Sequence, residues 1–419
     1  MDFSLSDHQL LIRDTVREFM NAEVRPHVKD WERTDHFPLD AIQKLGALGC
    51  CGMLMPEEWG GPGLDTISYV LMLEEVAKVH TAMSTALGVT NSAVQLPLLA
   101  HGTTQQKECY LKRLSSGEIL GAFCLTEPAA GSDAAGIQST AVACMAEKKE
   151  VCHPEQREGS ASSTRHSPPA ASHYLLNGTK TWVTNGSHAG VYIIFAKTDP
   201  ASAGKGVTAF LVEPNTPGLK IGRHEDKMGQ RSSPSVELIL NNCAVPEENR
   251  LGDEGAGLKI ALSALDGGRI GIAAQAVGLA QGALDESVKY ARARKAFGKS
   301  IGEFQAIQWM LADMHTEIEA ARALLYNAAF RKDFLSTASF SSSTSFTSSP
   351  SAASRAKLYA SEMVNRVVYK AVQIYGSLGY SRESEVERMY RDARVISIYE
   401  GTSEIQRIII ARDLLKSSL

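Results

Sequence analysis

The chain has 419 residues, of which 44% are hydrophobic and 21% charged, and its formal net charge is −4 at pH 7. The composition is ordinary for a globular protein, and the length is enough for two or three domains. The weak negative charge gives no general attraction to nucleic acid or anionic membranes. Seven scattered cysteines, none in a Cys-x-x-Cys pair, argue against a structural metal and suit a reducing compartment.

The N-terminal region, up to residue 122, has a mostly helical pattern and forms the first predicted domain. Its first 20 residues mix acidic and basic side chains and lack a continuous apolar core, so they predict a helix and not an export signal. No run of about 18 apolar residues occurs in the chain, which predicts no membrane span. We therefore expect a soluble, cytoplasmic protein.

Residues 123–243 have the pattern of a β domain. Short β-branched segments bounded by Gly, Pro and Asn predict strands at 191–197, 207–212 and 236–242. Residues 146–173 are polar and without periodicity, so we expect an inserted surface loop there.

Residues 244–419 predict a bundle of long helices. Apolar residues recur at steps of three and four within 257–292, 305–330 and 357–376. No proline interrupts the chain between Pro246 and Pro350, as long helices require. Serine dominates residues 336–354, which we expect to form a second inserted loop. The order of helices, β domain and helices predicts an α+β fold.

Several common catalytic motifs are missing from the sequence. It has neither a G-x-G-x-x-G after a predicted strand nor a G-x-x-x-x-G-K-[ST] phosphate loop, and the β region does not alternate strands with helices as a Rossmann domain does. H-E-x-x-H and G-x-S-x-G are also missing. The sequence therefore disfavours a nicotinamide-dependent Rossmann enzyme, a zinc hydrolase and a serine hydrolase.

Five segments, in order, resemble the acyl-CoA dehydrogenase family. They are FCLTEPAAGSD (123–133), LNGTKTWVTNG (176–186), RARKAFGKSIGEFQAIQ (292–308), QIYGSLGY (373–380) and IYEGTSEIQR (398–407). Apart from the two insertions, the resemblance covers nearly the whole chain and is closest to the short-chain, butyryl-type members. It implies a barrel-like middle domain, a C-terminal four-helix bundle and a homotetramer.

The resemblance also implies FAD as the cofactor. The segment 123–133 contains a turn of small residues that can approach a ring or phosphate closely, although a β-domain entry loop without a ligand explains it equally well. For Trp182 in the segment 176–186, a buried core tryptophan is the alternative to a flavin contact, and the two readings are compatible. By resemblance, the residues that contact FAD are Phe123, Cys124, Leu125, Thr126, Gly131, Ser132, Trp182, Val183, Thr184, Arg294, Phe297, Gln305, Gln373, Gly376, Ser377, Thr402 and Glu404. Ser377 departs from the family pattern, in which many members have a second glycine.

The segment around Glu400 is the most informative. Thr402 or Ser403 can cap the helix that follows, and a carboxylate just before a helix commonly serves as a cap or dipole partner. By resemblance, however, Glu400 is the catalytic base. In other branches of the family, the base stands just before a substrate-site arginine, and that position is Gly268, which cannot take a proton. We expect burial to raise the pKa of Glu400 to about 6–7.

The same resemblance implies the substrate contacts. Ser132, Asp266, Arg269 and Gly401 are expected to contact the acyl-CoA, while an ion pair within the helix is the alternative for Asp266 and Arg269. The implied reaction is α,β-dehydrogenation of a short-chain acyl-CoA to the trans-2-enoyl-CoA, a step of fatty acid β-oxidation. The β-hydride goes to flavin N5, and the electrons pass to electron-transferring flavoprotein. A flavin oxidase on the same fold and a non-enzymatic acyl-CoA or flavin-binding protein are the alternatives.

Overall fold

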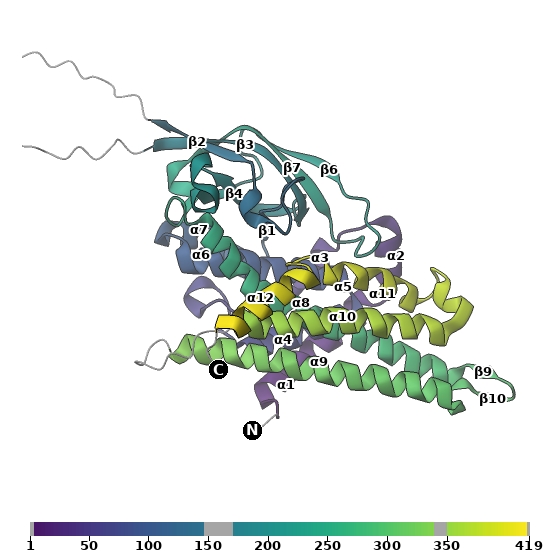
Figure 1. Ribbon diagram of the computed structural model, residues 1–419. Helices are drawn as coiled ribbons and strands as arrows, with labels where there is room; N and C mark the ends of the chain where they lie inside the picture. The colour runs from purple at the N-terminus through teal and green to yellow at the C-terminus, as the bar shows by residue number, and fades with distance from the viewer. Residues whose placement is uncertain (1–3, 146–170, 339–349, 417–419) are drawn as a thin grey trace, which may run out of the picture.

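The computed structural model describes residues 4–145, 171–338 and 350–416. Three parts follow one another along the chain: a helical N-terminal part, a β-sheet and a set of long C-terminal helices (Figure 1). The two helical parts pack on each other, and the sheet lies on one side of them. This arrangement confirms the predicted α+β fold.

The N-terminal part is a layer of short helices around one long buried helix. Ser6 begins α1 with a capping box, because its side chain accepts a hydrogen bond from the backbone of Gln9 while the Gln9 side chain bonds back to Ser6. Nearly every residue of α4 is buried, since α4 packs against both α1 and the C-terminal α8. The helices are α1 (Asp7–Phe19), α2 (Val28–Thr34), α3 (Leu39–Ala47), α4 (Thr66–Val79), α5 (Thr81–Gly88), α6 (Leu96–His101) and α7 (Thr104–Ser115).

The middle part is one mixed sheet. Its strands are β1 (Leu120–Cys124), β2 (Thr140–Met145), β3 (Ala171–Thr184), β4 (Ala189–Lys197), β5 (Val207–Val212), β6 (Leu219–His224), β7 (Ser235–Pro246) and β8 (Arg250–Leu251). The order is β6-β7-β3-β2-β4-β5-β8, and β1 pairs with β4 in parallel. Within the described residues, the end strands β6 and β8 are not paired with each other, so the sheet is open and not a closed barrel.

The sheet extends further along the chain than the pattern of residues 123–243 predicted. It begins at Leu120, because β1 joins β4, and it ends at Leu251, because β8 joins β5. The predicted loop at 146–173 is also too long at its C-terminal end. Ala171 pairs with Met145 and His173 with Cys144, so these residues belong to β3, while 146–170 lie outside the described residues.

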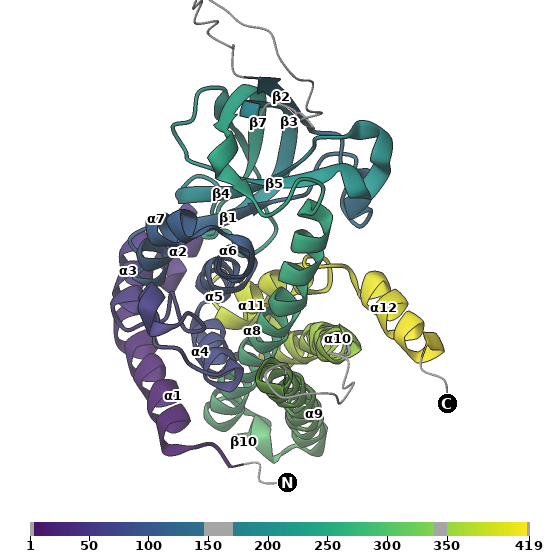
Figure 2. The same cartoon turned by 90° about the vertical axis from the view of Figure 1, so that its left-hand side faces the viewer.

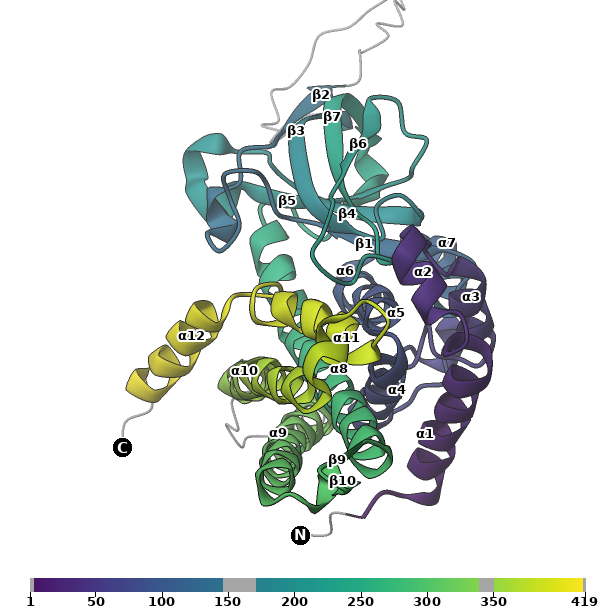
Figure 3. The same cartoon turned by 90° about the vertical axis from the view of Figure 1, so that its right-hand side faces the viewer.

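The C-terminal part consists of α8 (Gly257–Ala293), α9 (Gln305–Ala338), α10 (Pro350–Tyr375), α11 (Glu385–Ala393) and α12 (Ser403–Lys416). A small hairpin of β9 (Lys295–Ala296) and β10 (Lys299–Ser300) separates α8 from α9. The helices α8, α9 and α10 pack side by side, and α11 lies against α8 and α10. The last helix, α12, contacts α10 and lies at the outer side of the set (Figures 2 and 3).

The predicted loop at 336–354 is wrong at both ends. Residues 336–338 continue α9, and α10 begins at Pro350, where a proline is tolerated because the first helical turn needs no N–H donor. Ser351 and Ser354 are fully buried, and Ala352 and Ala353 join the core. Tertiary burial therefore makes a helix of residues whose serine-rich composition suggested a loop, while 339–349 lie outside the described residues.

Candidate active site

Glu400 lies in the short connection before α12, in a left-handed backbone conformation. Its φ is 53°, and that of Gly401 is 88°. Glycine adopts this region freely, whereas it costs a residue with a side chain roughly 1–2 kcal/mol. Contacts with the rest of the molecule must therefore hold the connection in place.

The carboxylate of Glu400 lies directly against Gly268 of α8. A Cβ atom added at Gly268 would come within 2.6 Å of Oε2 and 2.9 Å of Cδ of Glu400. The glycine thus makes room for the carboxylate. Glu400 and a side chain at position 268 would occupy the same volume, so the two positions are alternative places for an acidic group.

The surroundings of Glu400 change its acid–base chemistry. Its Oε2 atom is buried and has no hydrogen-bond partner among the residues that the structure describes. Burial raises the pKa of Glu400 to about 7, although the positive charges of Arg269 and Lys357 act in the opposite direction. This is the rise that the sequence predicted, and it gives the carboxylate a useful base strength near neutral pH.

Two residues that the sequence did not reveal hold the backbone beside Glu400. Lys357 of α10 is fully buried, and its Nζ donates to the carbonyl of Gly401 at 2.8 Å. Gln406 of α12 donates from Nε2 to the same carbonyl at 2.9 Å and to that of Glu400 at 3.2 Å. A signal for Lys357 existed, because it lies in the same helical stripe as Ser361 and Val364, which are also buried.

Asp266 and Arg269 form the ion pair within α8 that was the alternative to a substrate contact. Arg269 Nη1 lies 2.5 Å from Asp266 Oδ1. The Arg269 side chain is almost fully buried and that of Asp266 is about half exposed, so the pair runs from the interior to the surface. Burial raises the pKa of Asp266, and the Arg269 charge opposes that rise.

One group of predicted FAD contacts lies together at the ends of β1 and β3. The backbone N–H of Thr181 donates to the carbonyl of Thr126 at 2.9 Å, which joins the two segments. Trp182 has a φ of 58° and is 57% exposed, so it is not the core tryptophan that was one reading of this segment. Members of this group are Phe123, Cys124, Leu125, Thr126, Gly131, Ser132, Trp182, Val183 and Thr184. Cys124 and Val183 bury their side chains within the sheet, so only their backbone atoms can face a ligand.

A buried ion pair that the sequence did not reveal supports this group. Lys180, fully buried, donates to the carboxylate of Glu127 at 2.6 Å and to the carbonyl of Leu125 at 3.3 Å. Glu127 also accepts backbone N–H bonds from Gln138 and Ser139. The loop after β1 is thereby fixed to β3.

The other predicted FAD contacts lie elsewhere. They belong to the end of the helical part that carries the β9–β10 hairpin, away from the sheet (Figure 1). These residues are Arg294, Phe297, Gln305, Gln373, Gly376 and Ser377. Tyr290 stacks on Tyr375 with ring centroids 4.0 Å apart, which brings the ends of α8 and α10 together. Phe297 is 95% exposed. A single chain therefore does not join this group to the first.

Thr402 and Glu404 lie at the start of α12, close to Glu400 in sequence. Thr402 Oγ1 accepts from the backbone of Ile405, so it caps α12 as predicted. The Glu404 side chain is exposed.

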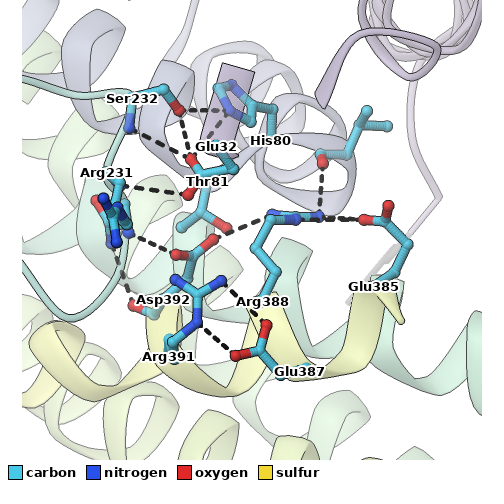
Figure 4. Close-up of polar contacts among 12 residues, drawn as sticks. Glu32, His80, Thr81, Arg231, Ser232, Glu385, Glu387, Arg388, Arg391 and Asp392 are labelled. Atoms are coloured by element: carbon cyan, nitrogen blue, oxygen red, sulfur yellow. Dashed lines mark hydrogen bonds and ion pairs between the residues drawn. The ribbon is translucent and has the colours of Figure 1, made fainter. Parts of the chain in front are cut away.

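A second cluster of buried charges lies where the three parts of the chain meet (Figure 4). Arg388 of α11 donates to Asp392 at 3.0 Å, to Glu385 at 2.8 Å and to the carbonyl of Val79 at 3.1 Å. Nearby, Glu32 accepts a hydrogen bond from Ser232, whose hydroxyl also lies 2.9 Å from Nε2 of His80. We call these residues the junction cluster.

Hydrogen bonds link the junction cluster to Tyr399, the residue before Glu400. The backbone N–H of Gln230 donates to Asp392, and its side-chain amide donates to the hydroxyl of Tyr399 at 3.4 Å. Tyr399 in turn donates to Gln275 of α8. Tyr399, next to Glu400 in sequence, is therefore bonded both to Gln230 of the middle part and to Gln275 of α8.

None of the helices that the described residues form is long and apolar enough to cross a membrane. Nor does that part of the chain gather three or more His, Cys, Asp or Glu side chains that could hold a metal ion.

Family profiles match almost the whole chain. The N-terminal domain of acyl-CoA dehydrogenases matches residues 6–118, the middle domain residues 155–243 and the C-terminal domain residues 255–415. These matches follow the order of the three parts of the fold.

Full-length relatives agree. The chain is 41% identical to the caffeyl-CoA reductase-Etf complex subunit CarC of Acetobacterium woodii, covering 98% of this chain and 99% of the relative. It is 40% identical to the butyryl-CoA dehydrogenase of Megasphaera elsdenii, with a TM-score of 0.88 and coverage of 99% and 100%. An acyl-CoA dehydrogenase of Bacillus anthracis, solved with FAD, is 33% identical with a TM-score of 0.86 and coverage of 99% and 68%. The chain therefore belongs to the acyl-CoA dehydrogenase family of FAD-dependent oxidoreductases.

Proposed function

We propose that this enzyme desaturates a short-chain acyl-CoA to the trans-2-enoyl-CoA, with Glu400 as the base that takes the α-proton. One observation carries the proposal: the buried Glu400 carboxylate, whose Oε2 no described residue bonds and whose pKa is raised to about 7. The weakly acidic α C–H group of a bound acyl-CoA would face this oxygen. The 40% identity to a butyryl-CoA dehydrogenase supports a short acyl chain.

The role of Glu400 follows from its protonation state. Only the ionised carboxylate can accept the α-proton, so the rate should rise as the pH rises through about 7. Gly268 gives the carboxylate room on the α8 side, and Gly401 lets the Gln406 side chain approach, since an added Cβ there would lie 2.8 Å from its Nε2. The backbone N–H of Glu400 is expected to donate to the thioester oxygen and stabilise the charge that develops there.

The residues present fit FAD. An exposed Trp182 in a left-handed conformation and the open space around Gly131, where an added Cβ would meet no atom within 4 Å, leave a surface that a flat ring and a phosphate can approach. We assign the flavin ring to the group at the ends of β1 and β3, with Thr402 and Glu404 nearby. FAD supplies the acceptor for the β-hydride when it is bound.

We infer that the rest of the FAD site comes from a second copy of the chain. Arg294, Phe297, Gln305, Gln373, Gly376 and Ser377 lie at the opposite end of the helices from the sheet. Phe297 is almost fully exposed, which is unusual for a large apolar side chain and favours burial against a partner. A homotetramer, the arrangement that the family resemblance implies, would bring both groups onto one FAD.

For the substrate, we assign Ser132 and Gly401 to the thioester end and the Asp266–Arg269 pair to the CoA portion. Asp266 reaches the surface and can contact a polar group there. We propose electron-transferring flavoprotein as the electron acceptor, because a 41% identical relative is named as a subunit of a complex with it.

The test is anaerobic mixing of the FAD-loaded enzyme with butyryl-CoA, with Glu400→Gln alongside. We expect the wild type to lose its visible flavin absorbance, and the variant to do so at least ~10²–10⁴-fold more slowly. Equal rates in the two proteins would rule out Glu400 as the base. Absence of bleaching by any short, branched or longer acyl-CoA would overturn the dehydrogenase assignment, and rapid reoxidation by oxygen would favour an oxidase.

A further inference from the structure

Lys357 is a buried charge that the proposed reaction does not yet use. Its side chain is 0% exposed, although lysine is almost never fully buried without a partner. Its ammonium group donates to the carbonyl of Gly401. Burial lowers the pKa of Lys357 to about 8, while the Glu400 charge acts against that change, so the ammonium form predominates at pH 7.

The carbonyl of Gly401 is bonded by two donors of different kinds. Lys357 reaches it from α10 with a charged group at 2.8 Å, and Gln406 reaches it from α12 with a neutral amide at 2.9 Å. This oxygen follows directly after the two left-handed residues, Glu400 and Gly401. Both donors can therefore fix the backbone that carries the base, but only one of them adds a charge.

Four ionisable side chains from the surrounding elements face the Glu400 carboxylate. Arg269 of α8 and Lys357 of α10 stabilise its ionised form, and Tyr69 of α4 and its neighbour Tyr399 also interact with its charge. The charge of Arg269 is offset by its ion pair with Asp266. Lys357 instead donates to a carbonyl, which has no net charge. Glu362 and Glu404 act on Lys357 as well, but Glu404 is exposed and Glu362 is paired with Arg407.

We propose that Lys357 is a positioning residue for the dehydrogenation: its ammonium group holds the Glu400–Gly401 backbone in place and favours the negative charge of the Glu400 carboxylate beside it. The inference deepens the proposed function and depends on Glu400 being the base. It assigns to Lys357 an electrostatic effect that Gln406, which bonds the same oxygen, cannot have.

The experiment compares the pH dependence of flavin reduction by butyryl-CoA in the wild type and four variants. Lys357→Met removes the donor and the charge, Lys357→Gln keeps a donor without the charge, and Lys357→Arg keeps both. Gln406→Leu is the matched control, because it removes a neutral donor to the same carbonyl. The infrared band of the protonated Glu400 carboxyl, identified by its loss in Glu400→Gln, is followed over the same pH range as a readout independent of turnover.

We expect Lys357→Met and Lys357→Gln to move the midpoint of the rate profile, and of the infrared band, upward by about one pH unit. The rate at pH 7 would then fall roughly fivefold from protonation of the base alone. Lys357→Arg should restore the wild-type midpoint, and Gln406→Leu should lower the rate at every pH without moving it. If Lys357→Met does not fold, Lys357→Gln alone decides.

The proposal falls if both charge-removing variants keep the wild-type midpoint, or if Gln406→Leu moves it equally. Failure of the proposed function looks different: Glu400→Gln would then reduce its flavin at the wild-type rate. In that case the infrared titration still reports whether Lys357 acts on the Glu400 carboxyl.

Discussion

Two buried carboxylates, Glu400 and Asp392, lie close in sequence, and burial raises the pKa of each to about 7. Their partners differ. Asp392 accepts hydrogen bonds from the backbone of Gln230 and from the guanidinium group of Arg388, whereas Oε2 of Glu400 has no partner among the described residues. A raised pKa therefore does not by itself identify a catalytic group. A buried oxygen without a partner does not do so either, because Glu74 also has a pKa raised to about 7 and an unbonded Oε1, although its Oε2 is paired with Arg322. Glu400 differs from both carboxylates in its position, against Gly268 and within the segment that carries the family resemblance.

The largest effect we expect follows from removing the cation that is bonded to Asp392. Arg388→Met would leave Asp392 and Glu385 without their buried cation, and loss of one partner from a buried ion pair costs about 3–5 kcal/mol. Denaturant unfolding at a fixed protein concentration measures the loss. The pH midpoint of the reaction should not move.

Arg391→Met is the control for Arg388→Met, because it lies on the same helix and removes an ion pair that solvent reaches, with Glu387. Its cost should be about 1 kcal/mol or less. If both variants lower the free energy of unfolding by the same amount, the buried charges of the junction cluster do not stabilise the fold more than a partly exposed ion pair does.

A smaller effect should follow from crowding the free carboxylate. Gly268→Ala would place a methyl group 2.6 Å from Oε2 of Glu400, at the end of a side chain that can swing aside. Stability should change little, but displacement of the base by about 1 Å should lower kcat roughly 10²-fold. Gly267→Ala is the matched control for Gly268→Ala, because its methyl group would come no closer than 3.2 Å to any atom, the nearest being in Leu96, and would not reach Glu400. Similar kcat values for the two alanine variants would contradict the geometry.

A further effect concerns the stability of the fold and its dependence on the charge of Glu400. The folded pKa of Glu400 lies above its usual value of 4.5, so this group destabilises the fold progressively as the pH rises from about 4.5 to about 7. Glu400→Gln should therefore be more stable than the wild type at pH 8.5, by about 3 kcal/mol, and the difference should vanish below pH 4.5. Chemical unfolding at the two pH values measures it. A variant that is less stable at pH 8.5 would show that the carboxylate is bonded after all.

Much of the fold was predictable, because local patterns determine it. The helices at 257–292, 305–330 and 357–376 were found from apolar residues at helical spacing, and the strands at 191–197 and 207–212 from β-branched runs. The start of α10 at Pro350 was not. Serines there are buried by contacts with distant helices, and composition carries no information on such contacts.

The candidate site was predicted in part. Resemblance identified Glu400, and the structure gives the raised pKa that burial was expected to cause. Lys357, Lys180 and Glu127 were missed, because a charged residue in a sequence normally indicates a solvated surface. Their partners are far away in the chain: Lys180 bonds Glu127 across 53 positions and Lys357 bonds Gly401 across 44. Only a folded backbone brings such groups together.

The hairpin of β2 and β3 has a practical consequence for protein engineering. Its strand ends, Met145 and Ala171, are register partners at the edge farthest from the helices (Figures 1–3). The cost of closing a loop between two such fixed points grows only slowly with its length. A reporter, a purification tag or a whole folded domain grafted between them should therefore leave undisturbed the other end of β3, at Trp182–Thr184, where the flavin ring is assigned.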